Sequence, residues 1–94
     1  MEGADISAVM DQRKSQFSAC YKAQARRDRS LAGEVLLRFT IRDDGTVQNV
    51  KVRETTLGNA AVERCMVKVG QSLRFQARAG RAPTKVWYPF SFTQ

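Results

Sequence analysis

The sequence contains no histidine, the side chain that most often acts as a general base or binds a metal near neutral pH. It has only two cysteines and no Cys-x-x-Cys pair, so the usual ligand set of a zinc site is also missing. A general base would have to be a carboxylate, but Asp43 and Asp44 belong to a turn signal and Glu63 falls on the polar side of a helical pattern. The glycines form no phosphate-binding loop. We therefore predict no enzymatic activity, no cofactor and no metal.

Long hydrophobic runs are missing as well. No apolar stretch approaches the roughly 20 residues of a transmembrane helix, and the chain does not start with a secretion signal. We expect any signal or membrane anchor to lie outside this chain, with residues 1–4 as a linker or vector remnant before a single domain of residues 5–94. A chain of 94 residues lies near the lower limit for burying enough apolar surface to fold alone, so a covalent cross-link would help.

Negative charge is scarce. Sixteen Lys and Arg residues against nine Asp and Glu residues give a formal net charge of +7. This balance favours anionic partners, such as nucleic acids, lipid head groups, cell-wall polymers or acidic peptides. A solvated basic surface without a specific ligand explains the charge equally well, so the sign alone does not choose among these classes.

The most apolar run of the chain is residues 35–41, and it alternates as a half-buried strand does. One side of an extended chain carries Val35, Leu37, Phe39 and Ile41. The other side carries two arginines, Arg38 and the following Arg42, so only one face of the sheet can be packed. The run is predicted to be the central strand, with its apolar face covered by amphipathic helices.

Two helices and two further strands are predicted around this strand. Apolar residues at three-to-four-residue spacing indicate helices over residues 5–27 and 59–73, and alternation indicates strands over residues 46–54 and 85–94. Asp43-Asp44-Gly45 is a hairpin signal, so the second strand runs back along the first. Its valines change parity, which predicts a bulge near Gln48-Asn49.

Pro89 places the last strand, because a residue without an N–H group is confined to sheet edges and bulges. With the hairpin partner on one flank of the central strand, the last strand takes the other flank. The predicted fold class is α+β: an αββαβ two-layer sandwich whose three-stranded antiparallel or mixed sheet has the order 2-1-3, with both helices packed on one face.

Cys20 and Cys65 each fall on the apolar side of a predicted helix. Helices that share one face of a small sheet can bring two such residues to bonding distance. Two free, buried thiols are the alternative, because cysteine packs as a small hydrophobic residue. The small size of the domain favours a disulfide, which would imply an oxidising compartment.

Several motifs, in this order and spacing, resemble one family. They are Phe17-Ser-Ala-Cys-Tyr21, Gly33-Glu-Val-Leu-Leu-Arg-Phe-Thr-Ile41, Asp44-Gly-Thr-Val47, Thr56-Leu-Gly-Asn59, Val62-Glu-Arg-Cys65, Leu73-Arg-Phe75 and Tyr88-Pro-Phe-Ser-Phe92. Together they make residues 11–92 resemble the TonB C-terminal domain, and most of all the branch found in bacterial gliding-motility envelope proteins (AgmX/PglI type).

This resemblance implies a periplasmic module of a longer protein that is anchored in the inner membrane. Such a module passes force or conformational change to an outer-membrane or periplasmic partner and binds a partner segment by strand addition. In the branch that this chain resembles, a cysteine usually occupies both helices, and Cys20 and Cys65 fall on those positions. Ala60 departs from the family, whose members often place a helix-starting proline there.

The open edge of the last strand is the predicted binding site, because its N–H and C=O groups have no partner within the sheet. The residues predicted to form this edge are Lys85, Val86, Trp87, Tyr88, Pro89, Phe90, Ser91 and Phe92. Pro89 interrupts the row at one point, which limits pairing or guards against aggregation. The expected partner is a protein, and two copies of the chain could also pair these edges in a weak homodimer.

The uncovered sheet face offers an alternative site. Possible anion or partner contacts on this face are Arg38, Arg42, Lys51 and Arg53. Such a face could hold an anionic cell-wall polymer. Nucleic acid is less favoured, because an RNA-binding sheet places two or three aromatic residues there and only Trp87 qualifies. Trp87 is either a binding anchor beside an arginine or a shield for the open face.

Overall fold

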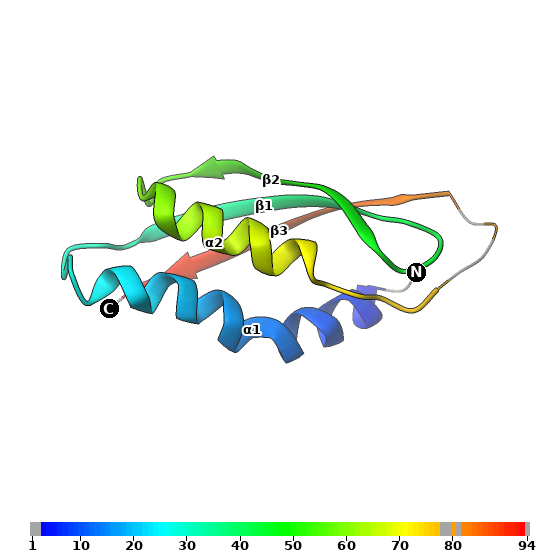
Figure 1. Cartoon of the computed structure of the whole chain (residues 1–94), viewed down its shortest axis with the longest axis horizontal. Helices are drawn as coiled ribbons and strands as arrows, with labels where there is room; N and C mark the ends of the chain where they lie inside the picture. The colour runs from blue at the N-terminus through cyan, green and yellow to red at the C-terminus, as the bar shows by residue number, and fades with distance from the viewer. Residues whose placement is uncertain (1–2, 78–79, 81, 94) are drawn as a thin grey trace.

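The fold is described from a computed structural model, which covers residues 3–77, 80 and 82–93. Its elements are α1 (Gly3–Ala25), β1 (Gly33–Ile41), β2 (Val47–Thr55), α2 (Ala60–Gln71) and β3 (Thr84–Phe92). They form two layers, a sheet and a pair of helices on one side of it (Figure 1). The αββαβ prediction is confirmed, with α1 beginning and ending two residues earlier than the sequence indicated.

The three strands form one antiparallel sheet in the order β2-β1-β3. The register between β1 and β3 is unbroken from the pair Gly33–Phe92 to the pair Ile41–Thr84. This confirms that the most apolar run is the central strand and that the strand containing Pro89 lies at an edge.

The β2 strand is irregular. Arg38 lies opposite Lys51, but two residues further along β1 the partner of Thr40 is Gln48. The extra residue in β2 falls beside Asn49, whose φ of 56° lies in the left-handed region that Asn tolerates better than most residues. The bulge predicted at Gln48-Asn49 is therefore present. A second register shift, opposite Leu36 and Leu37, was not predicted.

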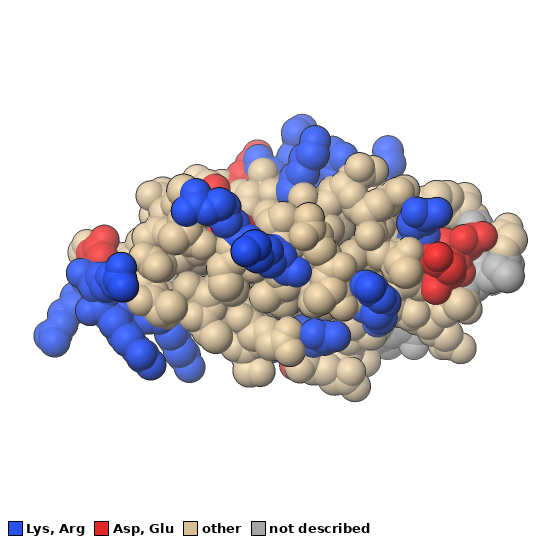
Figure 2. Space-filling model, in the orientation of Figure 1, with Lys and Arg blue, Asp and Glu red and all other residues tan. Residues whose placement is uncertain are grey.

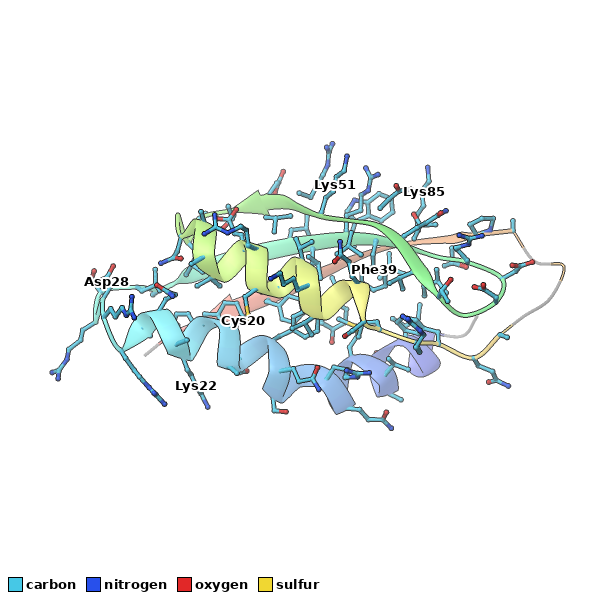
Figure 3. All side chains as sticks on the ribbon, viewed as in Figure 1. Cys20, Lys22, Asp28, Phe39, Lys51 and Lys85 are labelled. Carbon is cyan, nitrogen blue, oxygen red and sulfur yellow. A yellow bond between two sulfur atoms is a disulfide. The ribbon has the colours of Figure 1, made fainter. Side chains whose placement is uncertain are left out.

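The core lies between the sheet and the two helices. The largest fully buried side chains come from both helices, β1 and the segment after α2, and are Phe17, Phe39, Leu37, Met66, Leu73, Val35 and Val62. Phe39 points from the sheet toward the helices, whereas Lys51 and Lys85 point away from them (Figure 3). The helices thus leave one face of the sheet to solvent.

Local sequence explains the ends of α2 and its approach to the sheet. The Asn59 side chain caps the helix by accepting a hydrogen bond of 3.0 Å from the Val62 N–H. Gly70 in the last turn costs helix propensity, but its position is buried. A Cβ atom there would lie 2.7 Å from Val50 Cγ1, so glycine lets the helix pack closely against β2.

The segment after α2 was predicted to be an exposed basic loop over residues 76–84. Gln76, Ala77, Gly80, Ala82 and Pro83 are exposed. The two arginines of that segment, Arg78 and Arg81, lie outside the described residues.

Candidate functional site

The backbone of β3 is bonded on one side only, and neighbouring hydrogen bonds show which residues face outward. The Thr56 N–H donates to the Glu34 carbonyl (2.9 Å) and the Arg42 N–H donates to the Thr46 carbonyl (2.8 Å). Even-numbered residues of β1 therefore direct their backbone groups toward β2, and odd-numbered residues direct theirs toward β3.

The register carries this alternation into β3. The odd-numbered residues of β1 lie opposite the even-numbered residues of β3, from Thr84 to Phe92. Those residues exchange hydrogen bonds with β1. The odd-numbered residues of β3 direct their N–H and C=O groups to the free edge. They are Lys85, Trp87, Pro89 and Ser91.

The Pro89 nitrogen faces the free edge, so the lack of an N–H group at this residue costs the sheet no hydrogen bond. The edge keeps a continuous series of carbonyl acceptors. Its donors are divided into two groups, Lys85 and Trp87 before the proline and Ser91 after it. A partner strand can pair along the whole edge if it offers no carbonyl that needs a donor at Pro89.

The two edges of the sheet differ in their suitability for pairing. The β2 edge carries two register shifts within nine residues, and bulges of this kind are a common protection against edge-to-edge pairing. The β3 edge has a regular register along all nine residues. Of the two edges, β3 therefore has the more regular backbone, which is the geometry that strand addition requires.

A hollow follows the β3 edge on the side of the helices. It has a volume of about 230 Å³ and is lined by Met10, Asp11, Lys14 and Ser18 of α1 together with residues 88–92 of β3. This is smaller than the roughly 300–1,000 Å³ of small-molecule pockets. It suits side chains of an added strand that point toward α1.

Aromatic contacts fix the position of α1 along this hollow. The ring of Phe17 lies 4.7 Å from that of Phe90, and the ring of Tyr21 stacks on that of Phe92 at 4.9 Å. The Tyr21 hydroxyl also donates a hydrogen bond to the Leu31 carbonyl. The helix and the edge strand are thereby held as the two walls of one groove.

The open face of the sheet brings together some of the predicted cations. Arg38 lies between Lys51 on β2 and Trp87 on β3, and Lys85 lies opposite Thr40. Trp87 is 51% exposed, whereas Arg38 is half-buried and its Nε atom finds no hydrogen-bond partner among the described residues. The register thus places Trp87 beside Arg38.

The other two predicted cations lie outside this central group. Arg42 follows the last residue of β1 and belongs to the hairpin, where its carbonyl accepts a hydrogen bond from the Gly45 N–H (2.9 Å). Arg53 lies at the second register shift of β2 and has no partner residue on β1 in the register. Both side chains are exposed.

Two exposed carboxylates stabilise turns. Asp44 accepts hydrogen bonds from the Thr46 hydroxyl (2.6 Å) and the Thr46 N–H (3.0 Å), and these bonds lower the pKa of its carboxyl group. Asp28 accepts equivalent bonds from the hydroxyl and N–H of Ser30, which lower its pKa. The turn role predicted for Asp44 is therefore present, and the same arrangement at Asp28 was not predicted.

Residues 20–93 match the model of the family described as the Gram-negative bacterial TonB protein C-terminal domain. The chain belongs to this family. None of the curated proteins compared with the chain matches it. Two NMR structures of the Helicobacter pylori TonB C-terminal domain are similar to it in fold.

The first of these structures has a TM-score of 0.61 and 21% sequence identity, and the match covers 90% of this chain and 92% of that one. The second, of a longer fragment, has a TM-score of 0.51 and 18% identity, covering 97% and 89%. TonB C-terminal domains are periplasmic protein-interaction modules of energy transduction. The family assignment thus agrees with a binding edge.

Within this TonB C-terminal domain the two cysteines join the helices. The Sγ atoms of Cys20 and Cys65 lie 2.06 Å apart in a disulfide, and their Cα atoms lie 5.6 Å apart. Figure 3 shows the bond between α1 and α2. Cys20 is buried and Cys65 is half-buried.

Residues 3–77, 80 and 82–93 contain no group of three or more acidic or Cys side chains arranged to hold a metal ion. None of their helices has the length and apolar character needed to cross a bilayer.

The sequence did not reveal the contribution of α1 to the groove. Met10, Lys14 and Ser18 recur at four-residue spacing on one stripe of the helix, which begins at the buried Met10 and continues with the exposed Lys14 and the half-buried Ser18. That spacing was visible in the sequence. Which strand the stripe would follow depends on the position of α1 over β3, and this is a tertiary feature.

Proposed function

We propose that this TonB C-terminal domain binds an extended segment of an outer-membrane or periplasmic protein by strand addition to β3. The observation that supports it best is the alternation at the β3 edge, which leaves the backbone groups of Lys85, Trp87 and Ser91 without a partner strand in the sheet. The groove beside this edge gives the side chains of the added strand a surface to contact, and these contacts would select among partner sequences. The domain acts by binding and catalyses no reaction.

The wider setting forms part of the same proposal. The domain belongs to a longer protein anchored in the inner membrane, and it transmits force or conformational change to its partner across the periplasm. We assign it to the gliding-motility branch of the family because Cys20 and Cys65 occupy the two helices, as the resemblance implies. Crosslinking of the intact parent protein in cells, followed by mass spectrometry, would identify the partner.

NMR amide shifts test the site. Addition of a strand segment from the partner should perturb amide signals chiefly from residues 85–93. Perturbations confined to residues 46–55 would place the partner at the β2 edge and contradict the proposal. Light scattering over a concentration series would show whether free β3 edges also pair in a homodimer, which would raise the measured mass with concentration.

A second candidate function is binding of an anionic cell-wall polymer at the open face. The observation that favours it is the exposed Trp87 beside Arg38, with Lys51 and Lys85 on the same face. Trp87 is the sole tryptophan of the chain, so its fluorescence reports on this face alone. A fluorescence change on titration with the polymer that is lost in Lys51→Ala would support this function. An unchanged signal would contradict it.

A further inference from the structure

The groove along β3 continues into a second hollow whose chemistry is different. This hollow has a volume of about 490 Å³ and is lined by Tyr21, Lys22, Ala25, Arg26, Arg29 and Thr93. It adjoins the first hollow at both walls, because Thr93 follows Phe92 on one side and Tyr21 lies one helical turn beyond Ser18 on the other. The two hollows share no lining residue but lie end to end between α1 and the β3 edge, and together they are called the track.

The track is electrically asymmetric. The first hollow contains one anion and one cation on α1, Asp11 and Lys14. The second, cationic hollow contains three cations from the end of α1 and the following turn, which are Lys22, Arg26 and Arg29. Figure 2 shows Lys and Arg side chains gathered at this end of the molecule, where they extend beyond the body. The nearest acidic residue in the chain, Asp28, does not line the hollow, and its Oδ1 atom accepts two hydrogen bonds from Ser30.

We infer that the segment added to β3 carries a cluster of carboxylates at the end that passes Thr93, and that Lys22, Arg26 and Arg29 bind this cluster. This inference rests on the proposed function, since it describes the partner of the same edge. It follows from charge complementarity and from the continuity of the track. From Tyr88 to Thr93 the edge spans about 17 Å, at roughly 3.3 Å per residue, so about six partner residues pair with β3 before the acidic end.

The cationic hollow also gives the pairing a direction. Strand addition alone is compatible with a parallel or an antiparallel partner, because the free edge offers backbone groups to both. An acidic cluster at one end of the segment is attracted to the hollow in only one of these orientations. Electrostatic complementarity of this kind fixes register and raises the association rate more than it raises affinity.

A set of three synthetic peptides tests the inference. Each contains six residues of alternating threonine and valine; one carries two glutamates at its N-terminal end, one carries them at its C-terminal end, and one carries glutamines at both ends. At low salt, at least one of the acidic peptides should bind about tenfold more tightly than the neutral peptide, with amide shifts in residues 85–93 and in residues 22–29. The advantage should largely disappear in about 0.5 M salt.

The matching protein variants change equal amounts of charge at two places. In the double variant Arg26→Glu and Arg29→Glu the tenfold preference should be lost. In the control double variant Arg27→Glu and Lys68→Glu it should remain, because Arg27 lines neither hollow and Lys68 lies on α2, away from β3. The peptide comparison needs no substitution in the protein, so it holds even if a variant folds poorly.

Three results of the peptide comparison would overturn the inference. If all three peptides shift the amides of residues 85–93 with equal affinity, the cationic hollow is not used, while the proposed function stands. If the acidic peptides shift residues 22–29 alone, the two hollows are not one track. If no peptide shifts residues 85–93 at millimolar concentration, the proposed function fails together with the inference.

In an alternative role, Lys22, Arg26 and Arg29 only stabilise α1, because they lie at the negative end of its macrodipole. In that case the variant Arg26→Glu with Arg29→Glu would lower the melting temperature and leave the peptide preference unchanged. This outcome also overturns the inference, and thermal unfolding of both double variants distinguishes it.

Discussion

At the scale of single residues, the hairpin between β1 and β2 depends on one glycine. Gly45 has a φ of 89°, and its carbonyl accepts a hydrogen bond of 2.8 Å from the Phe75 N–H. A Cβ atom at this position would lie 2.1 Å from the Phe75 carbonyl oxygen. The turn signal was readable from the sequence, but the contact with Phe75 was not, because it joins residues 30 positions apart.

Gly45→Ala should therefore lower the free energy of unfolding by about 3 kcal/mol, the sum of left-handed backbone strain and the clash. Gly58→Ala is the matched control, because Gly58 has a φ of 68° and no atom within 4 Å of the added Cβ. The control should lose only about 1 kcal/mol. Urea unfolding measures both values, and equal losses would contradict the contact with Phe75.

The Asp44 carboxylate makes the free energy of unfolding depend on pH in the acidic range. Hydrogen bonds from Thr46 lower its folded-state pKa below the ordinary 3.8, so its contribution is present above that pH and is lost as the pH falls through the folded value. The free energy of unfolding should fall less steeply below pH 4 in Asp44→Ala than in the wild type. Equal slopes in the two proteins would contradict this role.

At the scale of elements, periodicity in the sequence was sufficient to predict all five elements and the bulge at Asn49. The central strand alternates without a break, and Pro89 placed β3 at an edge because only one flank was left. The second shift in β2, near Arg53, gave no signal, since no residue of unusual backbone preference marks it. The start of α1 was misplaced by two residues because the helix begins at Gly3, and glycine has a low helix propensity.

The free edge of β3 gives the sharpest test at this scale. Ser91→Pro removes an N–H that faces the edge and breaks no bond to β1, so the domain should fold but bind its partner strand at least about fivefold more weakly. Ser91→Ala keeps the N–H group and should bind as the wild type does. Titration calorimetry measures both. Equal binding by the two variants would mean that the backbone of this residue takes no part.

At the scale of the whole molecule, a small core is supported by a covalent link. The molecule is elongated, with extents of 46 × 21 × 18 Å, and the disulfide ties together the two helices that cover the sheet. The sequence allowed a disulfide or two free thiols, because the distance between two helices is not encoded in the local pattern of either. The packing of both helices on one face brings the two cysteines together.

Reduction of this disulfide should lower the free energy of unfolding by about 4 kcal/mol, because the link closes a loop between residues separated by 45 positions. Urea unfolding with and without a reductant measures the difference. Thiol titration of the unfolded, unreduced protein should detect no free cysteine. Two reactive thiols, together with no effect of the reductant, would contradict the link and the assignment to an oxidising compartment.

Hydrogen exchange along β3 tests the binding edge most directly. In the free domain the amides of Tyr88 and Phe90 should be protected and those of Trp87 and Ser91 should exchange fast, because only the former are bonded to β1. On addition of the partner segment, Trp87 and Ser91 should become protected as well. If they continue to exchange fast while the partner is bound, no strand has been added at β3, and the account of the binding edge is wrong.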